Sequence, residues 1–268
     1  MTMAPPDDPV SDVWRLLDRK FLAEVVRRSP RLVFATVSGA HLYGFASPDS
    51  DVDLRGAFVL DIREVLGLRT AEETITLSEK GRYDLDWVAH DLRKFARLLV
   101  SHNGYVLEQL FSPLVVVSTA AFAELRELGR GCVTRPTVRH YQGFARGRRQ
   151  RLHEPGPSVK HLLYAYRVLL TGIHLMRTGE VEANVLRLAE LLGEPEVPDL
   201  VERKRSGSER MALEPGEVAH HDIRLDRLEE TLTAAHASSR LPDEPTSRAA
   251  LEDFVIRLRL EPQRGAEQ

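Results

Sequence analysis

A short β-branched segment that leads through a glycine loop into two aspartates constrains this chain more than any other feature. Residues 32–37 lie between Ser-Pro and Ser-Gly, which predicts a buried strand. Residues 38–51 follow as a loop rich in Gly, Ser, Pro and Asp, and residues 52–60 form the next predicted strand. Side chains two positions apart share a face of a strand, so Asp51, Asp53 and Arg55 are expected to project together. Two carboxylates beside a glycine turn suit a hard divalent cation such as Mg²⁺.

The order of the predicted elements indicates an α+β protein. Strands are predicted at 74–77, 83–88 and 114–117, and amphipathic helices at 12–28 and from residue 91 onward. The rest of the chain reads as helices, predicted at 119–130, 136–152, 159–178, 182–193, 216–237 and 247–260. Because strands gather in the first half and helices in the second, we expect two subdomains, a catalytic one over residues 1–118 and a helical substrate-binding one over residues 119–268.

Composition excludes several classes of protein. Of the 268 residues, 43% are hydrophobic and 29% are charged, as in ordinary globular proteins, so a disordered or fibrous chain is not expected. A single cysteine, Cys132, rules out an intramolecular disulfide and indicates a reducing compartment. The sequence has neither a signal peptide nor an apolar run long enough for a membrane helix, so we predict a cytoplasmic protein without a membrane partner.

The net charge of −3 conceals a strongly basic segment. Between Arg135 and His161 the chain carries seven arginines and lysines against one acid, Glu154. Arginine-rich composition alone also follows from a GC-rich genome, but the clustering on one predicted helix is typical of phosphate-backbone binding. We therefore select Arg139, Arg146 and Arg149 as candidate nucleic-acid-binding residues.

The loop also carries a family resemblance. Gly39-Ala40 precedes Asp51-Val52-Asp53 by ten residues, and this spacing resembles the polymerase beta-like nucleotidyltransferase superfamily. Leu42-Tyr43-Gly44 together with residues 50–56 looks like a narrower group, the RlaP nucleotidyltransferases predicted to act in RNA repair. Further similarity lies in residues 92–95, in residues 102–113, and in Lys160, Tyr164, Arg167 and residues 175–179. The resemblance covers roughly residues 31–218 and implies a mixed sheet with flanking helices, followed by a helical subdomain.

The resemblance implies a nucleotidyltransferase that depends on Mg²⁺ or Mn²⁺ and moves an NMP from an NTP to a hydroxyl, releasing pyrophosphate. Asp51 and Asp53 would be catalytic and metal-binding, together with a third acid on the strand at 83–88. Asp84 and Asp86 are both candidates there because they alternate onto one face. We select Asp86, which lies six residues before Leu92.

The resemblance places nucleotide contacts on the loop and on two cations. The residues concerned are Ser38, Gly39, Ala40, His41, Ser50, Arg55 and Lys160. Ala40 departs from the family's serine, so the hydroxyl of Ser38 or the loop's backbone N–H groups would have to meet the phosphates. Arg55 has a second interpretation, as a brace between the aspartates, and Lys160 has one as an exposed helix residue. His220-His221 lack metal-ligand spacing, and we assign them no metal.

An RNA end is the acceptor that we favour, in RNA repair or on tRNA, with RNA-repair operon partners implied by the resemblance alone. A protein or a small molecule such as an aminoglycoside is the second candidate, although the basic segment disfavours a polycation. The third is a degenerate RNA-binding module that has lost turnover, which the alanine at position 40 motivates.

Overall fold

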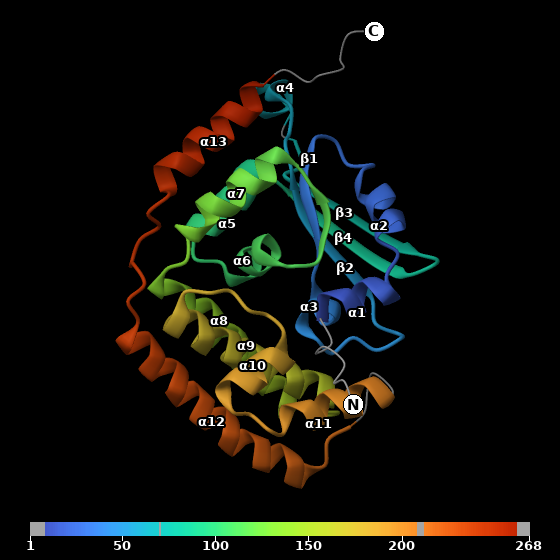
Figure 1. Cartoon of the computed structure of the whole chain (residues 1–268), viewed down its shortest axis with the longest axis vertical. Helices are drawn as coiled ribbons and strands as arrows, with labels where there is room; N and C mark the ends of the chain where they lie inside the picture. Colours follow the sequence, from blue (N-terminus) through green and yellow to red (C-terminus); the bar gives the residue numbers. More distant parts are fainter. Residues whose placement is uncertain (1–8, 70, 208–211, 262–268) are drawn as a thin grey trace, which may run out of the picture.

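The computed structural model describes residues 9–69, 71–207 and 212–261. A five-stranded mixed sheet has the order β3-β4-β2-β1-β5 (Figure 1). Strands β2 and β4 are parallel, and the other neighbouring pairs are antiparallel. The strands are β1 (Leu32–Val37), β2 (Val52–Phe58), β3 (Thr74–Lys80), β4 (Asp84–Asp91) and β5 (Val115–Ser118). Both the α+β class and the mixed sheet with flanking helices are confirmed.

Helices cover both faces of the sheet. In Figure 1, α5, α6 and α7 lie on one side of the strands and α2 on the other. These helices bury apolar side chains against the sheet, and Phe34 of β1 stacks on Phe122 of α7 with ring centroids 4.6 Å apart. The helices of this half are α1 (Pro9–Leu16), α2 (Arg19–Val26), α3 (Gly39–Tyr43), α4 (Ile62–Leu66), α5 (Leu92–Val100), α6 (Gly104–Phe111) and α7 (Ala120–Arg130).

The sequence predicts one continuous helix over residues 12–28, and this prediction is wrong. The structure has two helices there, because Asp18 leaves the helical conformation and its carboxylate accepts hydrogen bonds from the N–H groups of Lys20 and Phe21. The hydroxyl of Tyr83 accepts the N–H of Asp18 at 2.9 Å. An N-cap aspartate thus starts α2 inside an otherwise continuous apolar pattern.

The second half is a bundle around α9, most of whose side chains are buried. Helices α8, α10, α11 and α12 all pack on it, in the lower part of Figure 1. They are α8 (Val138–Leu152), α9 (Val159–Thr178), α10 (Val185–Leu192), α11 (Val197–Ser206) and α12 (Pro215–Ser238). The sequence pattern missed α11, because Pro195 and Pro198 read as breaks. Pro198 in fact lies in the first turn of α11, where a missing N–H costs nothing.

The last helix, α13 (Arg248–Leu260), leaves the bundle and packs on α5 and α7 (Figure 1). Its Arg259 binds both carboxylate oxygens of Asp91, which lies at the end of β4, at 2.8 Å each. Asp91 is completely buried and also accepts the N–H groups of Leu60 and Arg93. This ion pair ties the end of the chain to the sheet. No helix in the part of the chain that the structure describes is long and apolar enough to cross a membrane.

Candidate functional site

Two of the three predicted carboxylates lie side by side on neighbouring strands. Asp53 of β2 and Asp86 of β4 are Cα partners in the parallel pairing. Asp51 is exposed and precedes β2 by one residue. The same register leaves Asp84 at the exposed start of β4, where it pairs with Lys80 of β3. The pairing therefore brings Asp86, rather than Asp84, next to Asp53.

Arg55 lies between these two carboxylates. Its Nη2 donates to Asp53 Oδ1 at 2.7 Å and to Asp86 Oδ2 at 2.9 Å, and its Nη1 donates to the backbone oxygens of Leu54 and Asp86. Its side chain is 20% exposed, so water screens these contacts only in part. This geometry is the brace that the sequence offered as the second interpretation of Arg55.

Burial and neighbouring charges act on the pKa of the Asp53 carboxyl group. Burial raises its pKa above the usual range, and the charges of Asp86 and Asp51 add to the rise, while Arg55 opposes it. A cluster of carboxylates that repel one another gains most from a cation placed among them. Carboxylate oxygens are the ligands that Mg²⁺ or Mn²⁺ prefers, but Asp51, Asp53 and Asp86 are not among the described groups whose ligand atoms lie within 4.8 Å of one another, and Arg55 binds both Asp53 and Asp86.

Gly39 allows the loop to approach Asp53 closely. The N–H of Ser38 donates to the backbone oxygen of Asp53 at 2.8 Å, and the next residue, Gly39, has φ +60°. A Cβ on Gly39 would lie 1.8 Å from Asp53 Oδ2. Only glycine therefore fits between the end of β1 and the carboxylate. Ser38, at the N-cap of α3, and Ala40, in its first turn, are both buried. The Ser38 side chain makes no capping hydrogen bond.

The loop before Asp51 is held by a lysine from the helical bundle. Lys204 of α11 is 2% exposed and donates to the hydroxyls of Ser47 and Ser50, the latter at 2.9 Å. Its neighbour Arg205 donates to the backbone oxygen of Gly44 at 2.8 Å. Neither residue was predicted to contact the loop, because α11 itself was not predicted. The signal that could have found them was the proline in the first turn of that helix.

His41 and Lys160, two predicted nucleotide contacts, lie at different places around this loop. His41 is buried in α3, and burial lowers its pKa to about 4. Lys160 lies in the first turn of α9. The pKa of Asp49 is lowered mainly by a hydrogen bond from the Ser47 hydroxyl, and the nearby charge of Lys160 adds to this effect. Ser50 contacts Lys204, as described above. The cation of α9 thus borders the loop from the side of the bundle.

A buried ion pair packs against Tyr43, the last residue of α3. Glu108 of α6 and Arg167 of α9 bind at 2.6 Å, and each side chain is 1% exposed. The hydroxyl of Tyr43 donates to Glu108 at 3.3 Å, and the Arg167 guanidinium lies 4.0 Å from the centroid of the Tyr43 ring. Burial raises the pKa of Glu108, and Arg167 opposes that rise. Because Tyr43 is itself buried, it packs the loop and is not accessible to a base.

The three arginines selected from the basic segment do not share one surface. Arg149 binds Asp222 at 3.1 Å and also contacts Asp226 and Glu229, all on α12. Arg146 borders a small pocket on the same side, next to Glu229. Arg139, about two turns before Arg146 on α8, lines a different, open groove.

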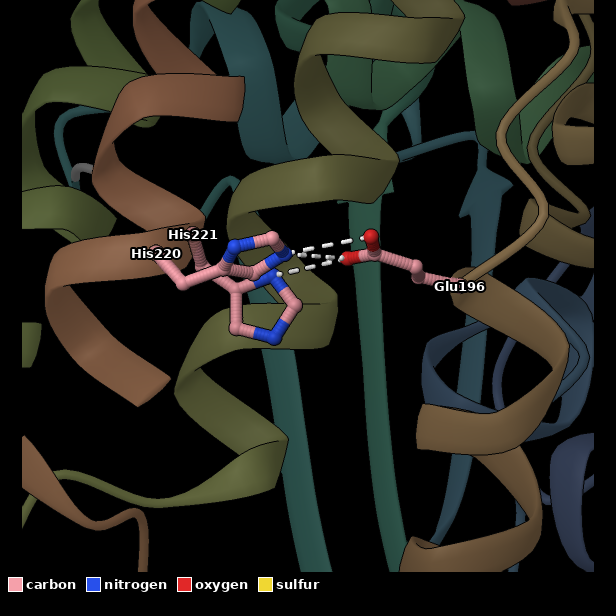
Figure 2. A group of neighbouring side chains, drawn as sticks. All are labelled: Glu196, His220 and His221. Atoms are coloured by element: carbon pink, nitrogen blue, oxygen red, sulfur yellow. Dashed lines mark hydrogen bonds and ion pairs between the residues drawn. The ribbon is translucent and has the colours of Figure 1, made fainter. Parts of the chain in front are cut away.

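A cluster that the sequence spacing did not suggest joins α11 to α12. Figure 2 shows Glu196, at the N-cap of α11, facing His220 and His221 of α12. His220 Nε2 lies 3.0 Å from Glu196 Oε2, and His221 Nδ1 lies 3.6 Å from the same oxygen. Arg224 also binds Glu196, at 3.1 Å, and Tyr166 bonds to His221 Nδ1 at 2.9 Å. The Arg224 cation and the tyrosine already satisfy these groups, so the cluster acts as a polar tie between two helices.

Two curated proteins are similar to this chain in sequence. The chain is 31% identical over 157 residues to the uncharacterized protein MJ0002 of Methanocaldococcus jannaschii, a match that covers 57% of this chain and 63% of that protein. It is 32% identical over 191 residues to the uncharacterized protein YcgL of Bacillus subtilis, covering 67% of this chain and 72% of YcgL. The chain thus spans less than two thirds of the archaeal relative.

A solved structure and a family profile complete the comparison. A nucleotidyltransferase-like protein of Exiguobacterium sibiricum aligns over 91% of this chain and 80% of its own, with 15% identity and a TM-score of 0.31. The profile of RlaP, described as the RNA repair pathway DNA polymerase beta family, matches residues 17–257. That range includes every predicted site residue. The chain belongs to the RlaP family, the RNA repair pathway DNA polymerase beta family.

Proposed function

We propose that this protein is a nucleotidyltransferase that moves an NMP from an NTP to a hydroxyl at an RNA end. The observation that carries the proposal is the pairing of Asp53 with Asp86 beside the Gly39 turn. Family membership supports nucleotidyl transfer, and the words RNA repair in the family's description support RNA as the acceptor.

In this proposal Asp51, Asp53 and Asp86 hold Mg²⁺ or Mn²⁺. When bound, the metal would neutralise charge on the triphosphate and lower the pKa of the attacking hydroxyl. The remaining tasks fall to the chain. The backbone of the Gly39 turn approaches the phosphates, Lys160 neutralises charge from the side of the bundle, and the Asp86 carboxylate accepts the proton of the hydroxyl.

The transfer itself is an in-line displacement. The acceptor oxygen forms a bond to the α-phosphorus, and the bond from that phosphorus to its bridging oxygen breaks, so that pyrophosphate leaves. Residues 1–118 would supply catalysis and residues 119–268 the substrate-binding surfaces, with α7 and α13 of the second segment packed on elements of the first. Positioning and charge neutralisation account for most of the acceleration in such reactions.

The test is transfer of label from the four α-labelled NTPs, with Mg²⁺, to total RNA, to protein extract and to small-molecule acceptors. We expect label in RNA, and a loss of about a thousandfold or more in Asp53→Asn. Asp84→Asn, on the same strand face as Asp86, is the matched control and should retain most activity. Absence of label in every acceptor, or equal transfer by Asp53→Asn, would refute the proposal. Label confined to protein or to a small molecule would reassign the acceptor.

A further inference from the structure

One face of α8 borders an open groove of about 460 Å³. Three arginines line it, Arg139, Arg148 and Arg151, and none of its described lining residues is acidic. Arg139 and Arg148 lie nine residues apart, at opposite edges of the groove, whereas Arg149 turns toward the acids of α12. Arg151 also binds Glu154 at 2.7 Å, but both side chains are largely exposed, so this pair contributes little and leaves the arginine available to a phosphate.

Two glycines leave the helix backbone in the groove accessible to close contact with a ligand. Gly143 and Gly147 lie one helical turn apart in its floor, and a Cβ at either position would meet nothing within 4 Å. Glycine inside a helix costs about 1 kcal/mol relative to alanine. Packing within the protein gives no reason for either residue. Bare helix backbone on a basic face allows a ligand to lie close against it.

Aromatic rings also line the α8 groove. Phe144 is partly buried, with its ring 4.8 Å from that of His140 and 4.5 Å, edge-on, from that of Tyr105. Burial lowers the pKa of His140 to about 4, so its ring is neutral near pH 7. A neutral aromatic wall beside arginines is the combination that binds unpaired bases together with their phosphates.

Tyr164 of α9 connects an arginine of the groove to the surroundings of the carboxylates. The Arg148 guanidinium lies 4.7 Å from the centroid of the Tyr164 ring, on α9. That ring packs against Phe45, in the catalytic loop, at 5.2 Å. Burial raises the pKa of Tyr164 to about 12, and the nearby charge of Asp53 adds to the rise. Tyr164 therefore stands between the arginines of the groove and the acidic site.

We propose that the α8 groove binds the single-stranded end of the RNA acceptor, with phosphates on Arg139, Arg148 and Arg151 and a base against Phe144. This inference rests on the proposed function, because it assigns the acceptor subsite of the same reaction. A single strand is favoured because a base must be unstacked to meet the aromatic wall. The positive lining disfavours a cationic acceptor.

The experiment measures binding without turnover, as fluorescence anisotropy of a short labelled single-stranded RNA with no NTP present. Gly147→Glu places a negative side chain in the groove without a clash, and we expect it to weaken binding about tenfold or more. Gly216→Glu, at an equally open glycine in the first turn of α12, is the matched control and should bind like the wild type. Melting curves would establish that both variants fold.

A second pair of variants tests the arginines. Arg139→Gln should weaken binding and reduce the slope of log affinity against log salt by about 0.7, as expected for one lost phosphate contact on a single strand. Arg130→Gln, at an exposed arginine of α7 outside the groove, should change the affinity less than about twofold. Equal effects of the two arginine variants would overturn the assignment of the groove.

The remaining outcomes separate this inference from the proposed function. Wild-type affinity in Gly147→Glu, or equal binding of a blunt RNA duplex, would overturn the groove while leaving nucleotidyl transfer intact. Asp53→Asn should bind RNA normally while losing transfer. RNA binding that depends on Gly147, in a protein that transfers no nucleotide, would support the groove and refute the proposed function.

Discussion

Asp53 and Asp86 face each other across two parallel strands with the guanidinium of Arg55 between them, 2.7 Å from one carboxylate and 2.9 Å from the other. Arg55 thus supplies the positive charge of this site when no metal is bound. We expect Arg55→Gln to lower stability by about 1–2 kcal/mol in EDTA, because two partly buried carboxylates lose their hydrogen-bonded cation.

The same variant should respond more strongly to Mg²⁺. Because the metal would replace the missing charge, Arg55→Gln should show a larger rise in melting temperature on adding Mg²⁺ than the wild type, by a few degrees. Thermal unfolding with EDTA and with Mg²⁺ measures both quantities. Arg130→Gln, which removes an exposed arginine paired with Glu127, is the control. Equal Mg²⁺ shifts in all three proteins would contradict the role given to Arg55.

Gly39→Ala tests the close approach of the loop to Asp53. The added methyl group would lie 1.8 Å from Asp53 Oδ2, on a residue with φ +60°, so the loop and the carboxylate must move apart. We expect transfer to fall about a hundredfold and stability to fall by about 1–2 kcal/mol. Gly81→Ala, in the turn between β3 and β4 where a Cβ meets nothing within 4 Å, should leave the rate unchanged. A wild-type rate in Gly39→Ala would refute this account.

Lys204→Met tests whether α11 positions the catalytic loop. The two serine hydroxyls that lose the ammonium lie 3.1 Å apart and can bond to each other. Removing the buried ammonium also removes its desolvation cost, which offsets the loss of the two hydrogen bonds that it donates. We therefore expect an unchanged or higher melting temperature, together with a transfer rate lowered about tenfold because the loop before Asp51 is less fixed. A fall in both quantities would indicate a structural role alone. Lys20→Met, at an exposed position of α2, is the control.

Acid should destabilise the protein through its buried histidines. Burial lowers the pKa of His41 to about 4 from an unfolded value near 6.5. The unfolded chain therefore binds more protons between these values, so stability is full above about pH 6.5 and falls as the pH drops toward 4. For His41 the loss is about 2 kcal/mol at pH 5.

Urea unfolding near neutral pH and at about pH 5 measures this effect. The variant His41→Gln should show a shallower dependence of stability on pH, since it removes one titrating group. His140, whose pKa is lowered to about 4 for the same reason, adds to the wild-type slope. An identical slope in His41→Gln would mean that His41 is not buried as a neutral ring.

Local patterns were sufficient for the part of the site that lies close together in sequence. Alternation along the strand predicted that Asp53 and Arg55 share a face, and the glycine turn before them was predicted as well. Alternation alone cannot separate Asp86 from Asp84, and Asp86 was selected through the family resemblance, by its distance from Leu92, without knowledge of the register of β2 against β4. The structure supplies that register, which puts Asp86 beside Asp53.

Long-range partners lay beyond the reach of the sequence patterns. Lys204 meets Ser50 across 154 positions, and Arg167 meets Glu108 across 59. Nothing in their local spacing marks them as pairs, since exposed and buried charges have the same appearance in a helix pattern. The basic segment shows the same limit: its charge was visible, but which arginines turn toward α12 depends on how α8 packs.

The Asp91–Arg259 pair has a consequence for how the chain is made. The two residues are 168 positions apart, and Arg259 lies in the last helix. During synthesis the sheet emerges long before its buried carboxylate can meet its guanidinium. Until α13 leaves the ribosome, Asp91 lacks its guanidinium partner and the sheet is less stable. A ribosome stalled before residue 248 should therefore display a first half that proteases cut readily, and release of the full chain should end that sensitivity.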